Sequence, residues 1–205
     1  MDKLVLLGAG GHCKSVIDAV EAMGKYDISG ILAPESGMLL GYPILGNDDV
    51  LINALNQGVA NLFIAIGASD IREKLHKKAE SIGFSFPNII DPSAAVSQHL
   101  RLGRGIFIGK NAVVNSGCII KDFAIINSGA VIEHECVVDT FAHVAPGAIL
   151  CGKVKIGTHT HIGAGAVVRE NISVGMHTLI GCASAVVKDI PEHVKAYGNP
   201  CKVLS

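Results

Sequence analysis

The stretch "INSGAVIEHECVVDTFAHV", residues 126–144, carries an aliphatic residue at every sixth position. The same spacing continues without a break from Ile90 to Val186, where every sixth residue is Ile, Leu or Val. The residue two places earlier is often small, as at Ala94, Ala112, Cys118, Ala124, Ala130, Cys136, Ala142, Ala148, Ala166 and Ser184. A period of six with one large apolar and one small residue predicts a β-helix of hexapeptide repeats. Three hexads make one triangular coil, so residues 18 apart should stack about 4.8 Å apart.

The residue directly after the periodic aliphatic position is often glycine or asparagine. We expect these positions to form tight corners that need positive φ. They are Gly103, Gly109, Asn115, Asn127, Gly157, Gly163, Gly175 and Gly181. The period does not determine the handedness of the coil, although ordinary crossover rules favour a right-handed one.

Residues 1–88 have a different pattern, that of a small α/β unit with a parallel sheet. "KLVLLGAGGH" reads as a strand that ends in a glycine turn, and "KSVIDAVEAMG" follows with helical spacing up to Gly24. "DISGIL" and "NLFIAIG" are expected to be further buried strands. "SDIREKLHKKAESIG" predicts an amphipathic helix that Ser69 or Asp70 caps and Gly83 ends.

Composition excludes several classes of function. The 205 residues are 49% hydrophobic and 17% charged, which excludes a disordered chain. A net charge of −1, no Trp and no basic cluster argue against a nucleic-acid or acidic-membrane partner. No apolar run reaches 18 residues, so no membrane span is expected, and "MDKLVLLGAGG" reads as a strand rather than a signal peptide. The six cysteines form no CxxC pair, which predicts reduced thiols in the cytoplasm.

Glu133, His134 and Glu135 interrupt the apolar pattern directly after Ile132. Their phase in the repeat predicts a turn whose side chains point outward. Gly152 lies 18 residues after His134, so we expect it to leave an open slot with an accessible backbone N–H beside the imidazole. A base, an orienting carboxylate, a slot and an N–H donor together indicate acyl transfer. A solvated corner without chemistry is the alternative interpretation of the same residues.

With these features the chain resembles the hexapeptide acyltransferases that have a small N-terminal Rossmann-like domain. These include bacterial sugar N-acetyltransferases, which act on UDP-4-amino sugars, and sialic acid O-acetyltransferases. The resemblance covers nearly the whole chain. It rests on "LLGAGGH" (6–12), "FIAIG" (63–67), "IREK" (71–74), "INSGAVIEHECVV" (126–138), "FAHVAPGA" (141–148) and "GNPCK" near the end.

The resemblance implies a left-handed β-helix, a homotrimer, and acetyl-CoA bound in grooves between neighbouring prisms. It implies three parts, namely residues 1–88 as a nucleotide-sugar-binding domain, residues 89–190 as the acyltransferase β-helix, and residues 191–205 as a tail near the CoA groove. His134 would be the general base, with Glu135 raising its basicity and Asn127 beside the substrate. Acetyl-CoA would contact His143, Gly152, Ala164 and Cys182, and Cys182 stands where the family usually has glycine. Transfer would be direct, because Cys136 has the phase of an inward residue.

The glycine turn "GAGGH" lacks the third glycine of the dinucleotide fingerprint, since Cys13 stands in its place. In the family this turn holds the nucleotide of the substrate, which indicates Gly10, Gly11, His12 and Gly67 as substrate-binding residues. Family members commonly place an acidic pair after the second strand, whereas this chain has Ala33 and Pro34 followed by Glu35. The substrate is therefore expected to differ from a standard UDP-amino sugar or to be held otherwise.

The most favoured function is N-acetylation of a nucleotide-linked deoxy-amino sugar for surface glycan synthesis, with acetyl-CoA as co-substrate. O-acetylation of sialic acid or another sugar and a catalytically silent scaffold are the alternatives. No metal is expected. His159 and His161 are read as solvent-facing, and no two histidines of the repeat have the five-residue separation of γ-type carbonic anhydrases.

Overall fold

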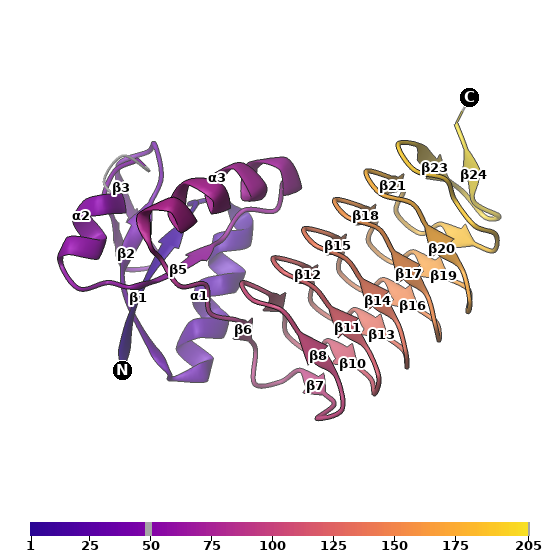
Figure 1. Ribbon diagram of the computed structural model, residues 1–205, viewed down its shortest axis with the longest axis horizontal. Helices are drawn as coiled ribbons and strands as arrows, with labels where there is room; N and C mark the ends of the chain where they lie inside the picture. The colour runs from indigo at the N-terminus through magenta and orange to yellow at the C-terminus, as the bar shows by residue number, and fades with distance from the viewer. Residues whose placement is uncertain (48–50, 205) are drawn as a thin grey trace. The chain divides into compact units, whose positions relative to one another are not determined.

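The computed structural model describes residues 1–47 and 51–204 and divides into two compact units, Met1–Pro92 and Ser93–Ser205 (Figure 1). Within the described residues, no helix has both the length and the apolar character that crossing a bilayer requires.

The first unit is built on a five-stranded sheet with the order β3-β4-β2-β1-β5. β1 pairs in parallel with both β2 and β5, so the predicted βαβ arrangement of the first two strands is confirmed. The hairpin of β3 and β4 and the short helix α2 were not predicted, because neither segment has a clear apolar period. The elements are β1 (Asp2–Leu7), α1 (Gly11–Met23), β2 (Tyr26–Leu32), β3 (Gly37–Leu39), β4 (Tyr42–Ile44), α2 (Leu51–Asn56), β5 (Asn61–Ile64), α3 (Ser69–Ile82) and β6 (Ile89–Ile90).

The helix ends agree only partly with expectation. Gly24 and Gly83 end α1 and α3 in the left-handed conformation, with φ of 60° and 109°, as predicted. The expected cap of α3 is wrong. Ala68 is the N-cap, and its carbonyl accepts the first helical hydrogen bond from Arg72 N at 3.0 Å, so Ser69 is already helical.

The second unit is a left-handed β-helix in which the short parallel strands between residues 95 and 186 each stack on the strand 18 residues away (Figure 1). Beyond them, residues 195–196 pair in parallel with 179–180, and residues 202–203 pair antiparallel with 196–197. Three sheets form its sides, and we name them the β13 face (β7-β10-β13-β16-β19-β22), the β14 face (β8-β11-β14-β17-β20) and the β15 face (β9-β12-β15-β18-β21-β23-β24). The strands are β7 (Ala95–Val96), β8 (Arg101–Leu102), β9 (Phe107–Ile108), β10 (Val113–Val114), β11 (Ile119–Ile120), β12 (Ile125–Ile126), β13 (Val131–Ile132), β14 (Val137–Val138), β15 (His143–Val144), β16 (Ile149–Leu150), β17 (Lys155–Ile156), β18 (His161–Ile162), β19 (Val167–Val168), β20 (Ser173–Val174), β21 (Leu179–Ile180), β22 (Ala185–Val186), β23 (Lys195–Tyr197) and β24 (Lys202–Val203).

The periodic aliphatic residues form the core of the β-helix. From Ile108 to Val186 each of them is the second residue of its strand and is buried, which confirms the period read from the sequence. Cys118 and Cys136 are buried in one column of small residues, as predicted, with exposed fractions of 1% and 0%.

The expected reason for the corner glycines is wrong. Positive φ occurs three residues after the aliphatic position, at every sixth residue from Gly105 to Ala183, and many of these residues are not glycine. The glycines directly after the aliphatic residue have ordinary φ. They are needed because a Cβ at Gly157 would lie 2.5 Å from the backbone nitrogen of Met176 in the next coil. Close approach of successive coils, not a left-handed backbone, therefore selects these glycines.

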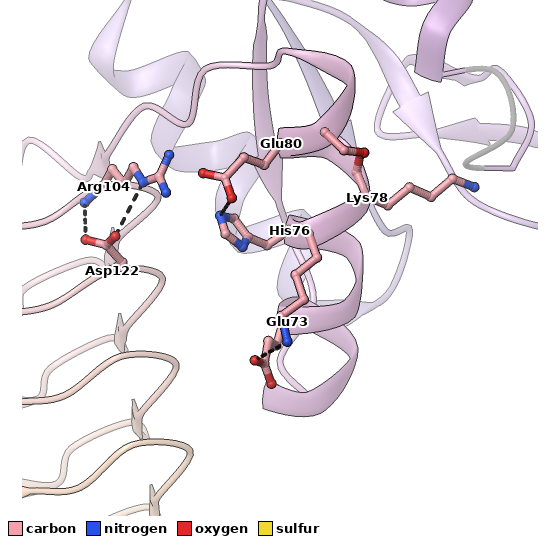
Figure 2. Close-up of polar contacts among 8 residues, drawn as sticks. Glu73, His76, Lys78, Glu80, Arg104 and Asp122 are labelled. Carbon is pink, nitrogen blue, oxygen red and sulfur yellow. Dashed lines mark hydrogen bonds and ion pairs between the residues drawn. The ribbon is translucent and has the colours of Figure 1, made fainter.

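Polar side-chain pairs also follow the local geometry of each unit (Figure 2). On α3, His76 and Glu80 lie one helical turn apart, with 3.5 Å between Nε2 and Oε2. On the β-helix, Asp122 is stacked 18 residues after Arg104, and its Oδ2 lies 3.3 Å from Nε of Arg104. Arg104 and Asp122 are both solvent-exposed, and an exposed pair contributes roughly 0–1 kcal/mol to stability, so the buried apolar columns dominate the fold.

Candidate active site

The predicted acyl-transfer residues lie on two different corners of the β-helix. The His134 corner joins the β13 face to the β14 face and contains the stacked turns 115–118, 133–136, 151–154 and 169–172. The Asn127 corner joins the β15 face to the β13 face and contains the turns 127–130, 145–148, 163–166 and 181–184. The third corner carries a stack of rings that begins at Phe123 and includes His159.

At the His134 corner the imidazole lies over Gly152. A Cβ built on Gly152 would lie 2.5 Å from Cε1 and 2.6 Å from Nε2 of His134. The glycine expected beside the histidine is present, but the imidazole itself occupies the space that the missing side chain leaves. Nδ1 of His134 lies 3.2 Å from Oε2 of Glu135. The His134 side chain is 58% exposed in the single chain.

Lys153 is a member of this corner that the motif did not reveal. Its Nζ lies 3.7 Å from the Glu135 oxygen that also contacts His134, and its backbone N–H donates to the His134 carbonyl at 2.9 Å. Lys153 stands 18 residues after Glu135, so the stacking rule contained the signal that would have found it. One carboxylate oxygen is therefore shared by an imidazole and an ammonium group.

The Asn127 corner holds a second polar pair. Nδ2 of Asn127 lies 3.1 Å from Nε2 of His143, and Oδ1 accepts the backbone N–H of Ser128 at 2.8 Å. His143, on β15, meets the ring of His161 edge-on with centroids 4.7 Å apart. Ala164 and Cys182 lie in the turns stacked above, half-buried and exposed respectively.

Within one chain, these two groups are not brought together. The β13 face lies between the His134 corner and the Asn127 corner, and within the described residues no side-chain hydrogen bond joins them. Gly152 is with His134, whereas His143, Ala164 and Cys182 are with Asn127.

The solvent-facing reading of His159 and His161 needs correction. His159 is half-buried and stacks on Phe141 and His177, with centroids 5.2 Å and 4.7 Å away. His161 lies on a strand and contacts His143. The stacking follows from the 18-residue repeat, which places His159 between Phe141 and His177.

The thiol nearest to the motif is unsuited to nucleophilic attack. Cys136 is fully buried and donates to the Cys151 carbonyl at 3.1 Å, while Cys118 donates to the Glu133 carbonyl at 3.0 Å. A hydrogen bond with Cys118 and burial both raise the pKa of the Cys136 thiol. The inward phase predicted for Cys136 is thus confirmed.

The first unit contains a cavity of about 660 Å³ at the carboxyl ends of β1, β2 and β5. All four residues predicted from the glycine turn line it, namely Gly10, Gly11, His12 and Gly67. The added lining residues that carry polar side chains are Glu35, Asn47 and Lys74. Gly8 has φ of 112°, and a Cβ at this position would clash with Ile66. The backbone conformation of the turn and its packing on Ile66 therefore require a glycine there.

A buried arginine supports the floor of this cavity. Arg72 of α3 is 1% exposed, and its Nη1 donates to the backbone carbonyls of Ile66 and Gly67. Burial lowers the pKa of Arg72 to about 10, with Asp70 opposing the shift. Burial, followed by the nearby Arg72 charge, lowers the pKa of His12 to about 4, so this imidazole is neutral at neutral pH. Arg72 belongs to the "IREK" motif, but its burial was not predicted, because it lies in the middle of a charged helix.

Comparisons with known proteins agree with both units. Residues 3–79 match the family model described as the PglD N-terminal domain. The crystal structure of PerB from Caulobacter crescentus in complex with CoA and GDP-perosamine is 38% identical, with a TM-score of 0.97 over 100% of this chain and 98% of that chain. The acetyltransferase domain of PglB from Neisseria gonorrhoeae FA1090 is 36% identical, with a TM-score of 0.95 over 100% of both chains.

A further structure shares the fold at lower identity. WeeI from Acinetobacter baumannii AYE is 24% identical, with a TM-score of 0.89 over 100% of both chains. None of the curated proteins matches the chain. The identity and full-length coverage of the PerB and PglB structures, together with the matched N-terminal domain, show that this chain belongs to the family of hexapeptide-repeat sugar N-acetyltransferases.

Proposed function

We propose that this chain transfers the acetyl group of acetyl-CoA to the amino group of a nucleotide-linked deoxy-amino sugar, in the synthesis of a surface glycan. The observation that carries the proposal is the His134 imidazole, which is laid over Gly152 and held at Nδ1 by Glu135. The relatives support the choice of substrates. PerB was solved with CoA and GDP-perosamine, and the PglB domain also with acetyl coenzyme A.

His134 is the general base in this mechanism. With Nδ1–H donating to Glu135, Nε2 presents its lone pair to the amine of the sugar. The amine nitrogen attacks the thioester carbonyl carbon as Nε2 takes its proton. The C–S bond then breaks, and the CoA thiolate takes the proton from the His134 imidazolium and leaves as the free thiol, which returns His134 to its neutral form. Transfer is direct, because the adjacent Cys136 is buried and kept protonated.

The backbone N–H of Gly152 is the proposed donor to the tetrahedral oxyanion. Among the described residues this N–H donates to no backbone carbonyl, and it lies in the turn directly beside the imidazole. A fixed donor at the site of developing charge typically contributes about 2.7–4 kcal/mol to transition-state stabilisation. The reaction needs acetyl-CoA as co-substrate and uses a protein base, so it requires no metal.

The same proposal makes the active site a shared site of a homotrimer. Asn127 and His143 can act on the substrate held at His134 only if a second copy supplies them, because the β13 face separates the two corners in one chain. The outward residues of that face are all apolar, as expected of a face covered by another copy. They are Ala95, Val113, Val131, Ile149, Val167 and Ala185.

In this arrangement acetyl-CoA lies in the groove between copies. His143, Ala164 and Cys182 contact it from one chain and Gly152 from the next, with the tail, residues 191–205, nearby. Cytoplasmic location is part of the proposal, because it would put the enzyme together with acetyl-CoA and nucleotide sugars.

Release of the CoA thiol in the presence of a panel of UDP-, GDP-, dTDP- and CMP-linked sugars tests the function. His134→Gln should keep the fold and lower kcat by about 10²–10⁴-fold, the usual contribution of a general base. A variant with near-normal turnover would remove His134 from the mechanism. Release with a hydroxyl acceptor alone would support sugar O-acetylation, and no sugar-dependent release would support a silent scaffold.

A further inference from the structure

The cavity of the first unit has one end suited to a diphosphate. It lies outside the carboxyl ends of β1, β2 and β5, where the strand order reverses direction around β1. Positions of this kind are the usual ligand crevice of open α/β sheets. Gly10 and Gly11 open helix α1 there, and a Cβ on either would meet no atom within 4 Å. The backbone at this helix N-terminus can therefore be approached closely by an anion.

The other end of the cavity, next to β2, is where the nucleoside would lie. In dinucleotide-binding sheets an acidic residue after the second strand binds the ribose hydroxyls. Here Ala33 follows β2 and is 4% exposed, so it offers the ribose no polar group. The first carboxylate is two residues further out, at Glu35, which is exposed and lines the cavity. It is the only carboxylate among the lining residues, all of which lie in the described part of the chain.

A carboxylate only accepts hydrogen bonds, and this property discriminates among bases. Guanine presents two adjacent N–H donors, at N1 and N2, which match the two oxygens of a carboxylate. Uracil and thymine present a single N–H between two carbonyl oxygens, which a carboxylate repels. Adenine and cytosine each place an acceptor nitrogen beside the amino donor. A bidentate contact to a base edge is typically worth about 1–3 kcal/mol of discrimination, or roughly 5- to 150-fold.

We infer that the nucleotide of the substrate is a guanosine diphosphate, and that Glu35 determines this specificity by holding N1–H and N2–H of the base. The inference rests on the proposed function, in that the cavity holds the nucleotide of the sugar donor. The 660 Å³ volume lies in the normal range of small-molecule sites. The loss of the acid at Ala33 is then explained, because the carboxylate has moved from the ribose to the base.

Calorimetric titration of the full chain with GDP, UDP, CDP and ADP, without acetyl-CoA, tests the inference. GDP should bind at least about tenfold more tightly than the other three. Glu35→Gln should lower the affinity for GDP by about tenfold and should not lower the affinities for the other three, because an amide can pair with the adjacent donor and acceptor that their bases present. Glu73→Gln, the same change at an α3 residue outside the cavity lining, is the matched control and should alter none of them.

Inosine diphosphate keeps N1–H but lacks the N2 amino group. Combined with Glu35→Gln, it forms a double-mutant cycle in which one change is made in the ligand and the other in the protein. It should bind the unaltered chain more weakly than GDP and should bind Glu35→Gln about as well as GDP does. Equal affinity of the unaltered chain for GDP and UDP, or a GDP affinity unchanged by Glu35→Gln, overturns the guanine assignment while leaving the proposed function in place. Failure of all four diphosphates to bind overturns both, because the cavity would then not hold a nucleotide.

Discussion

Replacing Gly152 by alanine tests the central geometry of the His134 corner. A Cβ at this position would lie 2.5 Å from Cε1 of His134, whereas carbon atoms in contact are about 3.5–4.0 Å apart. The ring must therefore move by about 1 Å or swing away, which also breaks its 3.2 Å contact with Glu135. A displacement of about 1 Å costs on the order of 100-fold in rate, or about 2.7 kcal/mol of transition-state stabilisation.

The fold should tolerate the same change. Gly152 does not have positive φ, and the imidazole is 58% exposed, so the ring can rotate into solvent. We expect Tm to fall by only a few degrees while kcat/KM for acetyl transfer, followed by thiol release, falls by about 100-fold. The alanine keeps the backbone N–H at position 152, so the loss reports the position of the base rather than the loss of the oxyanion donor.

Two further variants make the result decisive. Gly157→Ala is the matched control, because its Cβ would meet the backbone nitrogen of Met176 at 2.5 Å but touches nothing at His134. It should lower Tm and leave the rate per folded molecule unchanged. Gly152→Ala combined with His134→Gln should be no slower than His134→Gln alone, since both act through one group. A near-normal rate in Gly152→Ala, or fully additive losses in the double variant, would refute the reasoning.

Three other predictions follow from the two units. Mixing His134→Gln chains with His143→Ala chains, each inactive alone, should restore activity at about a quarter of the sites if subunits exchange at random. Thiol release measures this recovery. No recovery after exchange would show that one chain supplies both residues to the same site. The pKa of His12 is lowered from 6.5 to about 4 in the folded chain, so the unfolded chain binds more protons and the free energy of unfolding should fall by about 3 kcal/mol as pH drops from 6.5 to 4. Urea denaturation against pH checks this, and His12→Gln should flatten the slope over that window. Arg72→Met removes the donor to two backbone carbonyls of the cavity floor. It should lower the free energy of unfolding by about 1–3 kcal/mol and weaken nucleotide binding measured by titration. An unchanged nucleotide affinity would show that Arg72 does not support the binding site.

Sequence periodicity predicted the β-helix and nearly all of its buried aliphatic core. A repeat whose strands stack at a constant interval turns every long-range contact into a fixed separation in sequence. This is why the neighbour of His134 could be identified as Gly152, and why Cys118 and Cys136 could be placed in one buried column before any coordinates. The same interval relates Glu135 to Lys153, so the sequence also encodes this contact, although the motif around His134 does not reveal it.

The tertiary structure decided what the period leaves open. The period does not determine the handedness of the coil. The corner glycines were predicted to need positive φ, but the structure shows that the backbone of the next coil leaves no room for a Cβ, as at Gly157. Arg72 reaches carbonyls on another segment from a helix whose own pattern marks it as solvated. Sequence alone thus determined the contacts that a repeat sets at constant spacing. Handedness and the packing of non-repeating segments were determined only by the folded chain, because no fixed separation in sequence encodes them.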